Sequence, residues 1–304
     1  MPGLLTRIVC VLLVVVMLGC SRTEMAYRNA DWLLSRWVDG LLDPDTAQGD
    51  AWQEIIAQAM QTHQQQLLPD VVRLLEFAET TLADGLDQRD LTCWADSLER
   101  VYSAHAEWAI IPASEVLSDV SVTQAEHLAA ELRDRNQEYR EDYLDADPGR
   151  RHQERLQRYT ERIAYWIGDP TSAQRQLIDE AVTAMPDLAG DWLAYREERQ
   201  QALLSLLRSG ANRALLQDFL RAWWIDLDGR PGHLVEDAKV LRQATLELVQ
   251  RLDATLSDVQ RAAFTERVSG LRKDFAALRG PVGQSSTTAL ADHSCAGIGG
   301  VRQL

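Results

Sequence analysis

The chain has 304 residues, and 46 acidic residues against 31 basic ones give it a net charge of −15. A hydrophobic content of 46% is that of a globular protein with a sizeable core. So acidic a surface repels polyphosphates, which excludes nucleic acid as a partner. Only Lys239 and Lys273 are lysines. Because arginine suits planar pairing with carboxylates, we expect ion-paired helix surfaces and not a basic binding patch.

The first twenty residues have the features of an export signal. Arg7 supplies a positive charge, residues 8–18 are apolar, and Gly19 and Cys20 follow. This apolar run is too short to span a bilayer as a helix but suits the central region of a signal peptide. Positions 16–20 read VMLGC, which resembles the processing site of a bacterial lipoprotein. An uncleaved anchor or a buried helix is the alternative.

The lipoprotein resemblance implies both a cleavage and an anchor. In that family residues 1–19 would be removed as the signal peptide, and Cys20 would carry acyl chains that bind the lipid bilayer. Ser21 is not the aspartate that retains some lipoproteins at the inner membrane, so the outer membrane is favoured. We expect a lipid-anchored protein on the periplasmic side of the envelope. Residues 20–29 would form a lipidated linker with a reach of roughly 30 Å when extended.

The segment after the linker carries two tryptophans. Residues 27–39 read YRNADWLLSRWVD, and with Leu42-Asp43 and Gln48 they are similar to the opening of a proteobacterial lipoprotein family of undefined function. This resemblance implies an envelope location and a helical fold but no catalytic residue. Trp32 and Trp37 are about 140° apart around a helix, so one buried stripe cannot centre on both. At least one should lie at an edge, either at the level of lipid headgroups or packed into the bundle from another side.

Apolar residues recur at steps of three and four along most of the chain, as from Leu91 to Ala109, and strand-like alternation is absent. The sequence therefore predicts an all-α fold, an elongated multi-helix bundle. We assign residues 30–280 to this periplasmic domain, with a possible boundary between two lobes near 168–170. Residues 281–304 are rich in Gly, Ser and Thr, and we expect them to be disordered.

Four predicted helix starts share one pattern, in which an acceptor side chain stands three residues before a glutamine. This is the spacing of a capping box. The last copy also resembles the Leu-Thr-x-x-Gln motif of small periplasmic stress chaperones, helical hairpin dimers that hold unfolded clients. That resemblance implies a holdase function, whereas helix capping explains the pattern without it. The copies are Asp45 to Gln48, Ser121 to Gln124, Thr171 to Gln174 and Ser257 to Gln260.

Two polar segments, 121–146 and 148–167, share only a narrow apolar seam. A seam this thin buries one partner helix but no core, so we predict a protruding antiparallel hairpin with one-turn ion pairs such as Glu154 with Arg158. The hairpin could bind a partner or be an ordinary solvated surface. Our candidate partner surface comprises the aromatic residues Tyr139, Tyr143, Tyr159, Trp32 and Trp37.

Signatures of catalysis and of cofactor or metal binding are absent from the sequence. His127 with Glu131 and His105 with Glu107 are pairs of the kind that chance produces in acidic helices. We therefore assign no catalytic residue, no cofactor and no metal. With Cys10 removed and Cys20 acylated, Cys93 and Cys295 remain, and a disulfide between them is left open.

These observations favour a non-catalytic function, the binding of other envelope proteins as an adaptor or as a holdase. The alternative is a helical envelope hydrolase that acts on glycan or peptidoglycan through two carboxylates. A third option is a passive structural lipoprotein. A cleft with perturbed carboxylates would favour the enzyme, and an exposed apolar groove would favour binding.

Overall fold

The computed structural model describes residues 22–83 and 85–279. Within these ranges every regular element is a helix, which confirms the predicted all-α multi-helix fold. None of these helices is both long and apolar enough to cross a bilayer. In chain order they are α2 (Arg22–Arg28), α3 (Ala30–Leu42), α4 (Thr46–Gln66), α5 (Leu68–Ala83), α6 (Gln88–Ser118), α7 (Val122–Tyr143), α8 (Pro148–Ile167), α9 (Ser172–Ala184), α10 (Ala189–Arg208), α11 (Arg213–Trp224), α12 (Gly232–Asp253) and α13 (Asp258–Leu278).

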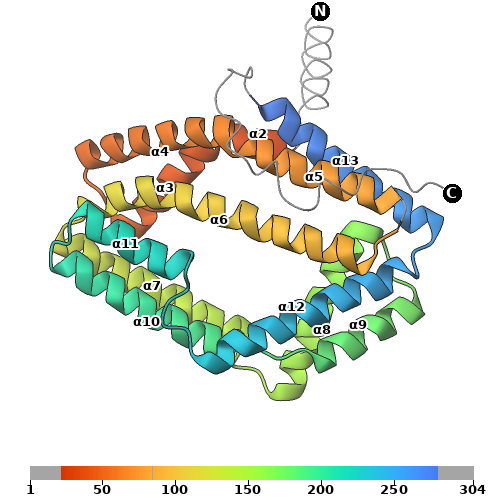
Figure 1. The fold of residues 1–304 in the computed structure, drawn as a ribbon. Coiled ribbons are helices and arrows are strands. Elements are labelled where there is room, and N and C mark those ends of the chain that lie inside the picture. The colour runs from red at the N-terminus through yellow and green to blue at the C-terminus, as the bar shows by residue number, and fades with distance from the viewer. Residues whose placement is uncertain (1–21, 84, 280–304) are drawn as a thin grey trace, which may run out of the picture.

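The helices pack around three apolar cores. The largest joins α3, α4, α6, α7, α10 and α11, with Trp52, Ala125 and Leu216 fully or almost fully buried. A second lies between α9 and α12 and is completed by α8, and a third lies between α5 and α13. Figure 1 shows α6 crossing the middle of the molecule, and its 31 residues connect the first core to the third. The lobe boundary near 168–170 stays a prediction.

The four predicted capping boxes meet in two pairs. At the start of α9, Thr171 and Gln174 form a complete box, and at the start of α13 Ser257 and Gln260 form another. The two glutamines then exchange hydrogen bonds: Gln174 Nε2 donates to Gln260 Oε1 at 3.0 Å, and Gln260 Nε2 donates to Gln174 Oε1 at 2.9 Å. Both side chains are buried. Each helix start is thus held by the other.

Gln48 and Gln124 pair in the same way at the starts of α4 and α7. At the start of α4 the predicted box is only half formed, because Asp45 accepts from the Gln48 amide but the Gln48 side chain bonds Asp119 and does not return to the Asp45 amide. The surrounding helices correspond too: α3 packs on α4 and α7, as α8 packs on α9 and α13. One arrangement therefore occurs twice in the chain. Its trace in the sequence is DPDTAQ at 43–48 and DPTSAQ at 169–174.

The predicted protruding hairpin is wrong. α7 packs on α10 and α3, whereas α8 packs on α9 and α13 (Figure 1). Its supposed seam divides between two cores, because Leu128 and Leu132 belong to the first and Leu156 and Ile163 to the second. Any helix can cover a narrow apolar stripe, so the stripe does not specify its partner. Here the stripes of α7 and α8 are covered by different helices. The two helices approach each other near their connecting turn, where Arg158 lies over Tyr143.

The ends of the chain are only partly described. Residues 1–19, predicted as a signal peptide, Cys20 and the tail predicted to be disordered at 281–304 lie outside the described residues. Within the predicted linker 20–29, α2 is a helix that packs on α13. Seven helical residues rise only about 10 Å, so the chain after Cys20 reaches less far than an extended linker would.

The glutamine pair predicts a specific loss of stability. Gln174→Ala removes the reciprocal half of one capping box. The Thr171 amide and the Thr255 carbonyl then lose their hydrogen-bond partner, and Gln260 Nε2 keeps only Asp169, so unfolding should become easier by about 2–3 kcal/mol. Gln176→Ala is the matched control, because that exposed side chain bonds only Glu180 one turn away, and it should cost about 0.3 kcal/mol. Urea denaturation measures both. Equal effects of the two changes would show that the pair does not stabilise the fold.

Candidate functional site

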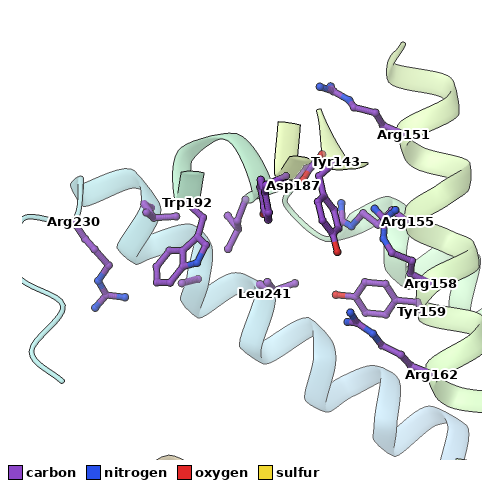
Figure 2. A pocket seen from close by; sticks show the side chains of 15 residues that line it. Tyr143, Arg151, Arg155, Arg158, Tyr159, Arg162, Asp187, Trp192, Arg230 and Leu241 are labelled. Atoms are coloured by element: carbon purple, nitrogen blue, oxygen red, sulfur yellow. Dashed lines mark hydrogen bonds between the residues drawn. The ribbon is translucent and has the colours of Figure 1, made fainter. Parts of the chain in front are cut away.

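A cavity of about 420 Å³ lies where α8, α12 and the start of α10 meet the end of α7. Leu234, Ala238 and Leu241 of α12 form an apolar wall, and Leu188 and Ala189 add to it from the start of α10. Figure 2 shows arginines of α8 along one side, with Trp192 and Arg230 across from them. The cavity therefore combines an apolar wall with a strongly basic edge.

The basic edge is a stripe on one helix. Arg151, Arg155, Arg158 and Arg162 follow one another at steps of four, three and four residues, which places them on one face of α8. Asp147 fixes the start of this helix by accepting hydrogen bonds from the Gly149 and Arg150 amides, and Pro148 takes the first position. Because the start is capped and the neighbouring face is held in the second core, the stripe has a fixed direction.

Two arginines of the stripe also hold the ends of other helices. Arg151 Nη1 donates to the Leu144 carbonyl at the end of α7, at 3.3 Å. Arg155 donates to the carbonyls of Met185 (3.1 Å) and Pro186 (2.9 Å) at the end of α9. A cation at a helix C-terminus meets the negative end of the helix dipole. Since a guanidinium has five donors, each side chain keeps N–H groups for a ligand.

The other two arginines of the stripe have no hydrogen bond or carboxylate partner within the described part of the chain. Arg158 lies over the Tyr143 ring, with its guanidinium carbon 4.7 Å from the ring centroid. The predicted pair of Glu154 with Arg158 is wrong, because Glu154 accepts from Arg150 at 2.8 Å. Arg162 is exposed at the cavity edge. The expectation that arginines would form only ion-paired surfaces therefore fails at this stripe.

The aromatic residues form a stack between two cations. Tyr139 and Tyr143 stack with centroids 4.6 Å apart, Arg158 covers the outer face of the pair at Tyr143, and Arg196 lies 4.7 Å from the Tyr139 ring. Arg196 Nε and Nη2 are buried without a hydrogen-bond partner among the described residues. Rings held between cations in this way fix the guanidinium positions by cation–π attraction.

The tyrosine hydroxyls supply neutral donors beside the arginines. Figure 2 shows those of Tyr143 and Tyr159 pointing into the same part of the cavity. Burial raises the pKa of Tyr139 above its ordinary value, so this phenol keeps its proton at neutral pH. Arginine and phenol groups together are donors for a carboxylate or a phosphate.

Acid–base chemistry has less support at this site. Asp187 is the one carboxylate among the lining residues, and it accepts from the Ala189 amide at 3.2 Å. The resolved shifts of carboxyl pKa values in the described residues are downward, at Glu79, Glu126 and Glu180, each caused first by a hydrogen bond from an arginine. A general acid needs the opposite shift. The geometry is therefore that of anion binding.

A protein-family model matches residues 40–224, and its description is "Family of unknown function (DUF6279)". The match covers more than half of the 304 residues. The chain belongs to this family. No curated protein and no solved structure matches the chain. Membership in a family of undefined function agrees with the resemblance found in the sequence.

The DUF6279 match contains much of the cavity. It includes Tyr139, Tyr143, Trp192 and the arginine stripe at 151–162, whereas Arg230 and the apolar wall from α12 lie beyond it. Trp32 and Trp37 lie before it. The basic edge of the cavity thus belongs to the DUF6279 region, and the opposite wall is built by the C-terminal helices.

The cavity brings together three of the five residues of the predicted partner surface. Tyr139, Tyr143 and Tyr159 line it, while Trp32 and Trp37 are 56% and 53% exposed on α3. The expectation that at least one tryptophan lies at an edge is confirmed, and neither packs into the bundle. Sequence reasoning missed the arginine stripe, although its spacing was visible. It also missed Arg230 and Trp192, which only the tertiary fold places there.

The other candidate residues have structural partners. Glu107 pairs with Arg221, and His127 Nε2 lies 3.2 Å from the Gly40 carbonyl. Residues 22–83 and 85–279 contain no group of three or more His, Cys, Asp or Glu side chains that could hold a metal ion. Cys93 is buried and disulfide-bonded, and every other cysteine of the chain, including Cys295, lies outside the described residues. None of these groups joins the cavity.

An aromatic cluster ties α2 to the helices beside it. The Tyr27 hydroxyl is 2.7 Å from His63 Nδ1, and the His63 ring meets the rings of His105 and Trp108 edge-on at 5.0 and 4.8 Å. Burial, with a smaller contribution from neighbouring His105, lowers the pKa of His63 from 6.5 to about 4. The neutral imidazole therefore belongs to the folded state.

This shift predicts how stability changes with pH. Because the folded-state pKa of His63 lies below the unfolded value, the unfolded chain binds the extra proton, so stability falls as pH drops from about 6.5 towards 4. The slope should stay below about 1.4 kcal/mol per pH unit, since one imidazole takes up at most one proton. His63→Gln should flatten the fall in melting temperature between pH 7 and 5. Exposed His233→Gln is the control. An unchanged profile in His63→Gln would contradict the assignment.

Proposed function

We propose that the protein is a membrane-anchored lipoprotein of the bacterial envelope that binds, without catalysis, an acidic segment of another envelope protein. The binding site is the cavity along α8. The observation that carries this proposal is the pair of arginines, Arg158 and Arg162, that point to the cavity without a carboxylate partner in the described structure of a very acidic chain.

Charge supports a short anionic ligand. Many arginines elsewhere on the described surface pair with carboxylates, as Arg208 does with Glu126 at 2.7 Å and Arg242 with Asp96 at 2.6 Å. In a chain with net charge −15, unpaired guanidinium groups beside one cavity create a local positive field. The rest of the surface repels long polyanions. A ligand must therefore present its negative charge locally, as one or two carboxylates on a peptide do.

The shape and lining of the cavity support a peptide with an apolar side chain. The wall from Leu234 to Leu241 offers apolar contact opposite the arginines. A volume of about 420 Å³ holds one or two side chains and is small for a surface that accepts many unfolded clients. This favours an adaptor that recognises a defined segment over a holdase.

The alternative, a hydrolase with two carboxylates, finds only one acid, Asp187, among the lining residues of this site. Anchoring rests on the sequence around Cys20, where VMLGC at 16–20 resembles a lipoprotein processing site. A lipid anchor would keep the cavity within reach of membrane-bound and periplasmic partners. We favour the outer membrane because Ser21 is not an aspartate.

The binding proposal is tested with a fluorescein-labelled hexapeptide of glutamate and leucine, followed by fluorescence anisotropy. The double variant Arg158→Gln/Arg162→Gln should weaken binding at least about tenfold, because each arginine offers charge-assisted hydrogen bonds. Arg150→Gln is the matched control on the same helix, since Arg150 is exposed and already paired with Glu154. It should leave binding nearly unchanged. A lysine and leucine hexapeptide should not bind.

Equal loss in both variants, or equal binding of the two peptides, would rule out the cavity as an acidic-peptide site. Thermal melting of each variant checks that the fold is kept. In cells, a photo-crosslinking amino acid at position 162 should capture one or two recurrent proteins. A broad range of products would favour the holdase. Absence of any product would direct attention to glycan or peptidoglycan ligands.

A further inference from the structure

The solvent-facing side of α3 is apolar. Trp32, Leu33 and Trp37 are 56%, 48% and 53% exposed, and Leu33 and Trp37 are one helical turn apart. The opposite face of α3 is the one that packs, through Ser35, Val38 and Leu42. Elsewhere on the described surface, Val240 and Val259 are exposed singly, and α6 exposes one pair a helical turn apart, Leu98 and Tyr102, but no tryptophan. Several large apolar side chains together on one exposed helix face indicate a partner.

The position of α3 in the chain indicates which partner. From Arg22, the first described residue, to Trp32 the chain runs through α2 and the start of α3. Helical rise and two extended residues place Trp32 no more than about 25 Å from Cys20. Met25 on α2, between the two, is also 48% exposed. The apolar face thus lies close to the point where the acyl chains would enter the membrane.

The polar groups beside the indoles fit a lipid headgroup. Arg135 lies over the Trp37 ring at 5.8 Å, and Arg36, on the same face of α3, is exposed and only loosely paired with Asp39 at 3.5 Å. Indole rings are favoured at the membrane–water interface, and a neighbouring guanidinium can meet a lipid phosphate. The large negative net charge makes a zwitterionic surface a better match than an anionic one.

We propose that the face of α3 formed by Trp32, Leu33 and Trp37 docks on the headgroup region of the bilayer and orients the anchored protein. This inference rests on the proposed lipid anchor at Cys20. A single lipid anchor leaves the protein free to rotate about the anchor. A second contact with the membrane beside the anchor restricts this rotation and so defines an orientation of the protein. The cavity along α8 would then face a fixed direction relative to the membrane.

The test uses the full chain purified from envelopes and reconstituted in phosphatidylcholine vesicles that contain a diazirine phospholipid. After irradiation, mass spectrometry compares label in tryptic peptide 29–36 with label in peptide 252–261, which carries exposed Val259. Docking predicts an excess of about tenfold in peptide 29–36, since interfacial indoles lie beside the lipid. Trp32→Ser/Trp37→Ser should abolish the excess, and Val240→Ser/Val259→Ser should keep it.

The outcomes separate docking from anchoring. Retention on the vesicles with equal labelling of the two peptides would overturn docking and leave the anchor standing. Release from the vesicles with no acyl chain on Cys20 would overturn the anchor and docking with it. The protein could also form a dimer in detergent that the double variant Trp32→Ser/Trp37→Ser does not form. That result would show that a second copy of the chain covers this face, and it would overturn docking on lipid.

Discussion

The starts of helices are the constraint on which this fold depends. The first amides of an α-helix have no partner inside the helix, and burying a helix start without one is costly. Here Gln174 and Gln260 satisfy their own capping boxes and then each other, and Gln48 and Gln124 pair likewise. Side chains more than seventy residues apart in sequence thereby fix two corners of the molecule. The small apolar cores alone would fix the positions of these helix starts less precisely, because apolar contacts have no preferred direction.

The corner formed by Gln174 and Gln260 also positions the candidate site. α8 ends directly before the DPTSAQ segment at 169–174 and packs on both helices whose starts that corner joins. The direction of α8, and with it that of the arginine stripe, is therefore set by the Gln174–Gln260 pair from one end and by Asp147 from the other. Arg155 closes the connection by binding the carbonyls at the end of α9. Along this helix face the two structural arginines, Arg151 and Arg155, come first, and the two unpaired arginines at the cavity, Arg158 and Arg162, follow.

Patterns in the sequence predicted the features that interactions between neighbouring residues determine. The helices and the capping boxes follow from spacing, because hydrogen bonds between residues three or four apart determine them. The packing partners of α7 and α8 could not be predicted in this way, since a stripe such as Leu156 to Ile163 indicates that a partner helix exists but not which one. The tyrosines of the site were predicted as a surface feature, and the arginine spacing on α8 was available but unused. Arg230, Trp192 and the wall from α12 depend on contacts that only the tertiary fold supplies.

The acidic surface and the basic cavity act together. On a surface of net charge −15 many arginines pair with carboxylates, and Arg150 pairs with Glu154 within its own helix. Arg158 has no carboxylate partner among the described residues, and its guanidinium carbon lies 4.7 Å from the centroid of the Tyr143 ring. Arg196 lies over the other tyrosine of the stack, Tyr139. Cation–π attraction has no counter-charge, so it positions a guanidinium without neutralising it. The aromatic stack therefore preserves positive charge beside the cavity of an acidic protein, which is what the proposed binding of a short acidic ligand requires.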